Sequence, residues 1–242
     1  AFGLPMIEKI DVKSKNVQGL VIAPTRELCV QISNDFKAFS KYIPKLNIAT
    51  IYGGASMDKQ AKEIRSGAQI IVATPGRLMD MMRRKMVKIN QVNYTVLDEA
   101  DEMLNMGFKE DIDGILEHTP QDKCTWLFSA TMPKTVAKIA NSYMENPLEI
   151  TIGHKNIGAE NIHHIYYNVN ERERYHAVKR ILDFHPNIYG LIFCRTRRTT
   201  QDIADKLLKD GYNAAPLHGD LSQMQRDKAM QKFREKTLQI LV

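Results

Sequence analysis

The chain has 242 residues, of which 43% are hydrophobic and 26% charged, a composition typical of a globular protein that can bury a core. No apolar run reaches the roughly 20 residues that a membrane-spanning helix needs, and the first residues lack the pattern of a secretory signal. We therefore expect a cytoplasmic protein. The net charge of +6 is concentrated in residues 153–242, which carry 15 Lys and Arg against 10 Asp and Glu. Such a balance fits nucleic acid, a membrane surface or an acidic protein as partner.

Short apolar runs rich in β-branched and aromatic residues alternate with stretches whose apolar residues lie three and four positions apart. The runs predict strands, and the stretches predict amphipathic helices. We expect strands at residues 20–23, 48–52, 69–73, 94–98, 125–129 and 148–152. Alternating strands and helices predict an α/β fold whose parallel sheet is covered by helices on both faces.

The alternation pauses at residues 153–161, a polar segment with two glycines, which we interpret as a linker between domains 1–152 and 162–242. The second domain is predicted to repeat the architecture of the first, with strands at 162–169, 190–194, 213–217 and 238–242 and helices at 171–184, 196–209 and 222–234. Residues 1–10 have a helical pattern without a start signal, and residues 238–242 form an apolar run with nothing after it. We therefore expect the sequence to be a piece of a longer chain.

The cysteines and histidines give no sign of a metal site. Cys29, Cys124 and Cys194 are odd in number and lie far apart, inside or beside apolar runs, which predicts buried, reduced thiols. The adjacent pair His163 and His164 would point to opposite faces of a strand. The sequence therefore predicts no metal site built from protein nitrogen and sulfur.

Consecutive carboxylates follow the strand predicted at residues 94–98, at the end where open α/β sheets bind their ligands. Nucleotide hydrolysis uses such a pair. Asp98 would hold Mg²⁺ through water, and Glu99 would orient or deprotonate the attacking water. The structural alternative is that Asp98 caps the next helix and the other acids occupy its electropositive first turn. These residues alone leave both interpretations open.

The strand predicted at residues 125–129 is followed by small hydroxyl residues and a helix. One interpretation makes Thr131 the N-cap of that helix, with Pro133 in its first turn. The other makes Ser129 and Thr131 a hydrogen-bonded relay to the carboxylates one strand away, which would couple hydrolysis to domain movement. Taken alone, the tripeptide Ser129-Ala130-Thr131 favours the interpretation of Thr131 as a helix cap.

Two further strand ends share a design in which Thr begins a helix and Arg follows in its first turn. A positive charge at the N-terminus of a helix is unfavourable because that end of the helix dipole is also positive, so an Arg at this position suggests a function. Exposed N–H groups, a hydroxyl and a guanidinium together would bind phosphate. The strand predicted at residues 48–52 ends in a Gly-Gly turn, which lets a phosphate chain approach the main chain. Ordinary turns remain the alternative. The segments are Pro24-Thr25-Arg26, Thr74-Pro75-Gly76-Arg77 and Gly53-Gly54.

The second domain has basic residues after two of its predicted strands. Arg195 follows the strand at 190–194 together with two more arginines, and Arg226 follows the strand at 213–217 after a His-Gly-Asp segment. A solvated basic face is the commoner meaning of such clusters. Both clusters nevertheless lie at strand ends, the same edge as the carboxylates of the first domain.

In this order the segments resemble the DEAD-box RNA helicase family over residues 1–242. The matching segments are Pro-Thr-Arg-Glu-Leu, Gly-Gly, Thr-Pro-Gly-Arg, Asp-Glu-Ala-Asp, Ser-Ala-Thr, Phe-Cys-Arg-Thr and His-Gly-Asp followed by Gln-x-x-Arg. The resemblance implies two RecA-like lobes that close on ATP and single-stranded RNA and separate strands locally. It makes Asp98 the Mg²⁺-associated carboxylate and Glu99 the general base.

The resemblance also assigns the remaining site residues. It places Asp101, Ser129 and Thr131 in the coupling network and leaves Phe193 packing in the core of the second lobe. The implied contacts to the RNA backbone are Pro24, Thr25, Arg26, Gly53, Gly54, Thr74, Pro75, Gly76 and Arg77 in the first lobe, and Arg195, Gly219, Gln223 and Arg226 in the second. Such contacts carry no base code, which predicts sequence-independent and salt-dependent binding.

One departure from the family pattern concerns the phosphates of ATP. No Gly-x-x-x-x-Gly-Lys-Ser/Thr segment occurs in the 242 residues, so the backbone amides and Lys of that loop are missing. We expect this chain by itself to lack ATPase and helicase activity, whereas the parent protein has both. The alternatives are a nucleic-acid-binding or scaffold module that hydrolyses no nucleotide, and a dinucleotide oxidoreductase, which the lack of a Gly-x-Gly-x-x-Gly turn disfavours.

Overall fold

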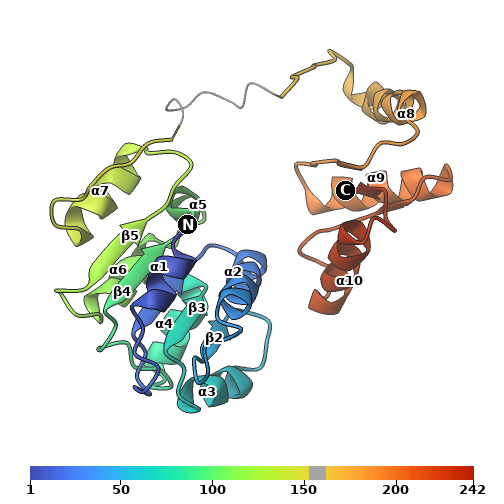
Figure 1. Cartoon of the computed structure of the whole chain (residues 1–242). Helices are drawn as coiled ribbons and strands as arrows, with labels where there is room; N and C mark the ends of the chain where they lie inside the picture. The colour runs from blue at the N-terminus through green and yellow to red at the C-terminus, as the bar shows by residue number, and fades with distance from the viewer. Residues whose placement is uncertain (153–161) are drawn as a thin grey trace. The chain divides into compact units, whose positions relative to one another are not determined.

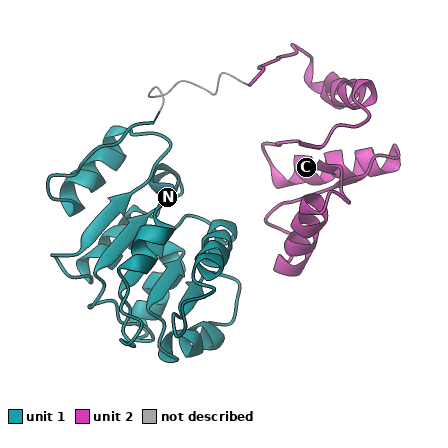
Figure 2. Ribbon diagram, viewed as in Figure 1, with its two compact units in different colours: residues 1–158 teal, residues 159–242 magenta. Residues whose placement is uncertain are grey.

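The computed structural model describes residues 1–152 and 162–242, and the chain forms two compact units, residues 1–158 and 159–242 (Figure 2). The linker predicted at 153–161 lies outside the described residues. No described helix is long and apolar enough to cross a membrane.

Unit 1 is built on a five-stranded sheet in which every neighbouring pair of strands is parallel (Figure 1). The strand order is β2-β3-β1-β4-β5, so the sheet is not laid down in chain order. The central strands β1 and β3 are buried along their whole length, as their uninterrupted apolar sequences require. The strands are β1 (Gly19–Ile22), β2 (Ile48–Ile51), β3 (Ile70–Ala73), β4 (Tyr94–Leu97) and β5 (Cys124–Leu127).

Helices cover both faces of this sheet and create two cores. Because successive side chains of a strand point to opposite faces, Leu20 and Ile22 of β1 belong to one core and Val21 to the other. Helices α1 (Gly3–Glu8) and α2 (Arg26–Phe39) pack on the Val21 face. The opposite face is covered by α3 (Met57–Arg65), α4 (Pro75–Arg83), α5 (Ala100–Asn105), α6 (Lys109–Glu117) and α7 (Lys134–Tyr143).

Unit 2 contains a three-stranded parallel sheet in the order β6-β8-β7. Its main core joins Leu182, Leu207 and Ile240, which come from two helices and the central strand. The elements are β6 (Gly190–Leu191), β7 (Ala214–Ala215), β8 (Ile240–Leu241), a short 3₁₀ helix (Glu171–Glu173), α8 (Arg174–Phe184), α9 (Arg197–Lys209) and α10 (Gln223–Arg234). The predicted parallel sheets flanked by helices are therefore confirmed.

Two predicted strands are wrong. Residues 148–152 and 162–169 form no strand, and Leu148 and Ile165 are 85% and 71% exposed. An apolar run becomes a strand only where a neighbour completes its hydrogen-bond ladder, and in the described part of the chain no strand pairs with either segment.

The prediction of three buried thiols holds only for Cys29. Cys124 is exposed and Cys194 is partly buried. Cys124 begins β5, which lies at the edge of the unit 1 sheet, and an edge strand has neighbours on one side only.

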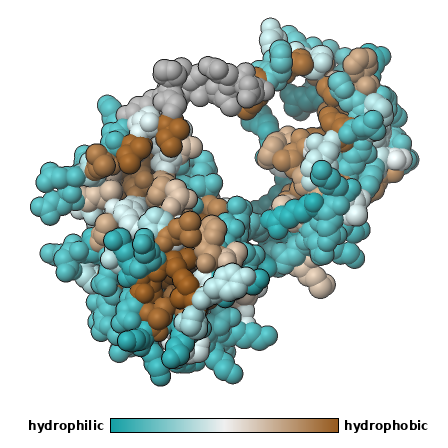
Figure 3. All heavy atoms as spheres, viewed as in Figure 1, coloured by the Kyte–Doolittle hydropathy of each residue, from teal (hydrophilic) through white to brown (hydrophobic). Residues whose placement is uncertain are grey.

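Apolar side chains also remain on the surface of unit 1, including Leu4 and Phe39, and hydrophobic residues gather on its face toward the viewer (Figure 3).

Candidate functional site

The carboxyl ends of the five strands of unit 1 lie along one edge of the sheet, and the strand order sorts the predicted site residues along it. The three predicted phosphate-binding segments follow β2, β3 and β1, which are neighbours. The predicted catalytic residues follow β4 and β5, which form the other end of the same edge. The strands of each group also follow one another in the chain, and the strand order adds that β1 lies next to β4, so that the first group borders the second.

The segment after β1 presents the first turn of α2. Thr25 is the N-cap of this helix, and its Oγ1 accepts a hydrogen bond from the Leu28 amide at 3.2 Å. Arg26 begins the helix, and its guanidinium carbon lies 4.8 Å from the centre of the Tyr52 ring, a cation–π contact. Because β3 lies between β1 and β2, this contact joins the two outer segments of the phosphate-binding group.

The segment after β3 begins α4 with Pro75, whose missing N–H costs nothing at a first helical position. Thr74 is the N-cap, but its side chain makes no capping hydrogen bond, so the hydroxyl is not committed to the helix. Arg77 donates from Nη1 to the Ala55 carbonyl at 3.0 Å and to Gln60 Oε1 at 3.4 Å. Arg77 therefore lies against the turn that contains Gly53 and Gly54.

Sequence reasoning missed Gln60. A glutamine within an amphipathic helix carries no motif, and only the folded chain shows that this buried side chain reaches the strand-end turn.

Asp98 and Glu99 lie directly after β4. The Asp98 amide donates to the Ile22 carbonyl at 2.9 Å, which extends the pairing of β4 with β1 and fixes the backbone at the carboxylates. Asp98 is half-buried and Glu99 is exposed. Glu99 has φ 51° and ψ 52°, a left-handed conformation that costs a residue with a side chain about 1 kcal/mol or more and is concentrated at functional sites.

The structural alternative is wrong for Asp98, although Asp101 and Glu102 do lie in the first turn of α5, as this alternative expected. Glu99, not Asp98, occupies the N-cap position of α5, and its side chain makes no capping hydrogen bond. Burial raises the pKa of Asp98. Burial also raises the pKa of Glu99, and the negative charges of Asp98, Glu102 and Asp101 add to this effect. Partly desolvated acids that repel one another are stabilised by a cation, so the pair suits a metal ion.

Asp101 is tied to the segment after β5. It is only 6% exposed, and its Oδ2 accepts hydrogen bonds from the Thr131 amide at 3.0 Å and from Thr131 Oγ1 at 2.6 Å. Ser129 Oγ donates to the Thr131 carbonyl at 2.6 Å. Burial acts to raise the pKa of Asp101, but the hydrogen bonds that the hydroxyl and the amide of Thr131 donate to this carboxylate outweigh burial and lower it.

The interpretation of Thr131 as a helix cap is wrong. Helix α7 begins at Lys134 with Pro133 as its N-cap, which makes no side-chain cap. The hydroxyl of Thr131 is directed instead at Asp101. The structure thus brings together Asp101, Ser129 and Thr131, as the hydrogen-bonded relay requires.

In unit 2 the predicted residues lie after β6 and β7 and at the start of α10. Arg195 is exposed. A Cβ atom added to Gly219 would lie 3.5 Å from the Arg197 side chain, which forms an ion pair with Asp220 at 2.6 Å. Arg197 thus links the two strand ends. A residue with this role was not predicted, because only the fold brings the strand ends together.

Gln223 and Arg226 face each other within the first turn of α10. Gln223 Oε1 accepts a hydrogen bond from Arg226 Nη2 at 2.7 Å, and Arg226 Nε is buried without a partner among the described residues.

The prediction that Phe193 packs in the core of the second lobe is wrong, because this side chain is 91% exposed. Ile192 and Cys194 contribute to the core, whereas Phe193 between them is turned outward in the segment after β6.

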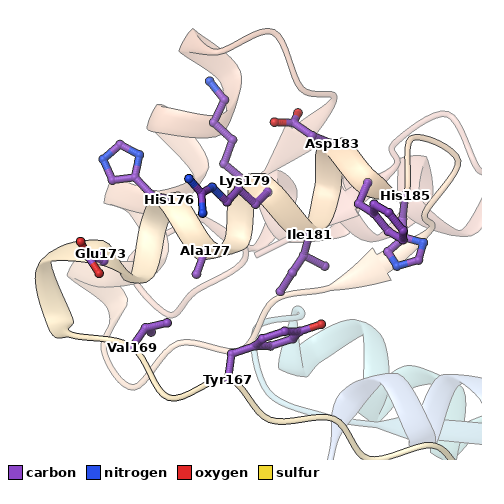
Figure 4. Close-up of a pocket in the computed structure, with 11 residues that line it drawn as sticks. Tyr167, Val169, Glu173, His176, Ala177, Lys179, Ile181, Asp183 and His185 are labelled. Carbon is purple, nitrogen blue, oxygen red and sulfur yellow. The ribbon is translucent and has the colours of Figure 1, made fainter.

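A cavity of about 900 Å³ in unit 2 lies beside α8 and contains none of the predicted site residues. Ala177 and Ile181 of α8 point toward Val169 and Tyr167, whereas Lys179 points away (Figure 4).

In the described part of the chain, no three His, Cys, Asp or Glu residues are grouped as a metal site. Mg²⁺ in phosphate-transferring sites commonly uses one or two carboxylates, with waters and phosphate oxygens completing its shell. Asp98 with Glu99 beside it supplies oxygen donors of that kind, so these residues fit such an ion.

The sequence matches two protein families. Residues 1–139 match the DEAD/DEAH box helicase family, and residues 173–242 match the helicase conserved C-terminal domain. The DEAD-box ATP-dependent RNA helicase CshA of Bacillus subtilis is 40% identical over the whole chain, which covers 49% of that protein. The ATP-dependent RNA helicase DeaD of Mycobacterium tuberculosis is 42% identical, with 43% of its length covered. The chain thus spans about half the length of these curated relatives or less.

Solved structures show the same similarity. A DEAD box protein from the hyperthermophile Methanococcus jannaschii is 40% identical, with a TM-score of 0.60 over 99% of this chain and 64% of that one. S. cerevisiae Dbp5 bound to RNA and ADP BeF3 is 27% identical, with a TM-score of 0.87 over 100% of this chain and 61% of that one. The predicted class, with parallel sheets flanked by helices as in RecA-like lobes, is confirmed by these similarities.

Proposed function

The chain belongs to the DEAD/DEAH box helicase family, and on this basis we propose that it supplies the RNA-binding edge and the water-activating carboxylates of an ATP-dependent RNA helicase. One observation carries the proposal. The segments predicted to bind phosphate follow three neighbouring strands, the last of which lies next to the strand that precedes the carboxylates, so RNA and nucleotide would meet along one sheet edge. The similar Dbp5 structure, which holds RNA and ADP BeF3, supports this arrangement.

RNA binding in unit 1 would use the starts of α2 and α4 together with the Gly53-Gly54 turn. Helix N-termini present N–H groups and a partial positive charge, and Arg26 and Arg77 add guanidinium groups. The predicted contacts are Pro24, Thr25, Arg26, Gly53, Gly54, Thr74, Pro75, Gly76 and Arg77. These groups recognise the sugar-phosphate backbone rather than base edges, so binding would be independent of sequence.

Hydrolysis would use the two carboxylates after β4. Asp98 would hold Mg²⁺ through water, and Glu99, exposed and in a left-handed conformation, would orient the attacking water and take up its proton. Mg²⁺ bound with ATP would supply charge neutralisation at the phosphates. The raised pKa of Glu99, caused by burial and neighbouring acids, makes it a stronger base than an ordinary glutamate.

Coupling between hydrolysis and movement would run through Asp101. This carboxylate lies three residues after Asp98 and holds Thr131 through two hydrogen bonds, with Ser129 bonded to the same segment. A shift at the carboxylates would therefore be transmitted to the loop that leads into α7. In this role Asp101, Ser129 and Thr131 act by position rather than by contact with the phosphates.

We assign residues 1–152 to the first RecA-like lobe, 153–161 to a linker and 162–242 to the second lobe, in a cytoplasmic protein. Arg195, Gly219, Gln223 and Arg226 would extend the RNA-binding surface on unit 2. Since the 242 residues contain no phosphate-binding loop, this chain by itself should hydrolyse no ATP, whereas the parent protein should.

The test is RNA-stimulated ATP hydrolysis by the full-length parent protein, measured beside a Glu99→Gln variant. A Glu117→Gln variant is the matched control, since Glu117 is exposed near the end of α6. We expect Glu99→Gln to reduce turnover by roughly 100-fold or more, the usual contribution of a general base, and Glu117→Gln to leave it unchanged. A Glu99→Gln variant as active as the parent would show that Glu99 is not the general base, and a full-length protein without RNA-stimulated ATP hydrolysis would favour a nucleic-acid-binding module that hydrolyses nothing.

A further inference from the structure

The turn after β2 needs support that its own residues do not provide. Gly53 and Gly54 are exposed, Gly54 has φ 81°, and a Cβ atom added to Gly53 would have no neighbour within 4 Å. Glycine loses more conformational freedom on folding than any other residue, so such a turn stays in one conformation only where other groups hold its backbone.

Gln60 of α3 holds this backbone from inside. Its side chain is 4% exposed, and its Nε2 donates to the Tyr52 carbonyl at 3.1 Å. Its Oε1 accepts from Arg77 Nη1 at 3.4 Å, and the same nitrogen of Arg77 donates to the Ala55 carbonyl at 3.0 Å. Gln60 thus holds the turn at Tyr52, Arg77 holds it at Ala55, and the two side chains are hydrogen-bonded to each other.

The bonds leave Arg77 able to bind a further partner. A guanidinium has five N–H donors. Within residues 1–152 and 162–242 both hydrogen bonds of Arg77 start from Nη1, so the donors on Nε and Nη2 remain for a phosphate. Arginine is long and flexible, and fixing it before binding lowers the entropy lost when a ligand arrives. The position of the guanidinium therefore depends on Gln60 and on Ala55.

We infer that Gln60 is a positioning residue for RNA: it aligns the Gly53-Gly54 turn with Arg77 so that both meet one stretch of backbone. The inference rests on the proposed RNA-binding function of this edge. Gln60 itself lies too deep to touch RNA, so its effect must pass through Arg77 and the turn.

If Gln60 only stabilised the fold, replacing another buried glutamine should affect RNA binding in the same way. Gln69 provides this matched control. Gln69 is also a buried glutamine, 2% exposed, and its side chain accepts from the Asn47 amide at 2.8 Å and donates to the Ser14 carbonyl at 2.8 Å. It precedes β3 and therefore lies at the opposite edge of the same sheet. Replacing either glutamine by Met keeps the side-chain length and removes buried hydrogen bonds.

The experiment measures binding of fluorescein-labelled single-stranded oligo(U) to the 242-residue chain by anisotropy over a range of salt concentrations. We expect Gln60→Met to weaken binding about threefold to tenfold, the range for one or two lost hydrogen bonds. The slope of log K against log[salt] should become shallower by about 0.7, the value for one lost phosphate contact on a single strand. Gln69→Met should leave both quantities unchanged.

Arg77→Ala and the double variant complete the test. If Gln60 acts through Arg77, adding Gln60→Met to Arg77→Ala should weaken binding by less than twofold more. If Gln60→Met does not fold, Gln60→Glu replaces it in the binding assay. This variant should also weaken RNA binding, because a carboxylate cannot donate a hydrogen bond to the Tyr52 carbonyl.

The inference is overturned if Arg77→Ala weakens binding while both Gln60 variants bind like the parent, or if the effects of Gln60→Met and Arg77→Ala multiply in full. If the unsubstituted 242-residue chain does not bind oligo(U), the proposed function is overturned, and this inference with it.

Discussion

The hydrogen bonds between Asp101 and Thr131 make a prediction that can be measured without nucleotide or RNA. Thr131→Val removes the hydroxyl that donates to Asp101 Oδ2 at 2.6 Å and keeps the shape of the side chain. A hydrogen bond to a charged group contributes about 1.5–3 kcal/mol, and because Thr131 is exposed and water can replace its hydroxyl, we expect a loss of about 1–2 kcal/mol.

The assay is urea unfolding followed by the fluorescence of the single tryptophan, Trp126, which lies in β5 and therefore reports unit 1. Asp101→Asn and the double variant complete a cycle, in which we expect a coupling free energy of about 1 kcal/mol or more. Thr135→Val, an exposed threonine in the first turn of α7, is the control and should change the free energy of unfolding by less than about 0.5 kcal/mol.

The pH dependence follows from the direction of the shift. The folded pKa of Asp101 is below its ordinary value of 3.8, so its hydrogen bonds contribute fully above that value and are lost as the pH falls through the folded pKa. The difference between parent and Thr131→Val should therefore be constant from pH 8 to about pH 5 and shrink in stronger acid. Additive effects of Thr131→Val and Asp101→Asn would refute the reasoning.

Three further predictions concern reactivity and stability. Burial raises the pKa of Cys29 to about 12, so iodoacetamide at pH 8 should label exposed Cys124 first, and mass spectrometry showing equal rates would contradict the described burial. Phe36→Ala, which empties a site 1% exposed in the core, should cost about 3–5 kcal/mol in the same urea assay, and a cost below about 1 kcal/mol would contradict the packing. Thr25→Ala removes the cap bond to Leu28 and should cost about 1 kcal/mol, whereas Thr25→Ser should restore it.

Local chemistry made most elements of unit 1 predictable. The strands around Leu20 and Ile71 are apolar without interruption because helices bury them on both faces, and each is bounded by turn residues that mark its ends. Thr25 was recognisable as a helix start from its residue type and position, and its side chain makes the expected cap. Signals of this kind depend on neighbours in sequence.

Features set by distant neighbours could not be predicted. The strand order that brings Tyr52 beside Arg26 across the end of β3 has no counterpart in periodicity. The left-handed backbone of Glu99 is atypical for its residue type, so no local pattern indicated it. Ile165 lies in a segment with the pattern of a strand and still lacks a pairing partner among the described residues.

The central claim is that RNA binds the sheet edge formed by the strand ends of unit 1. Crosslinking of 4-thiouridine-labelled single-stranded RNA, mapped by mass spectrometry, tests it most directly. If RNA binds this edge, the crosslinked peptides will contain residues 24–26, 53–54 and 74–77. Residues 83–88 include four Lys and Arg at the other end of α4, and crosslinks confined to them would show that charge alone attracts RNA and would contradict the account.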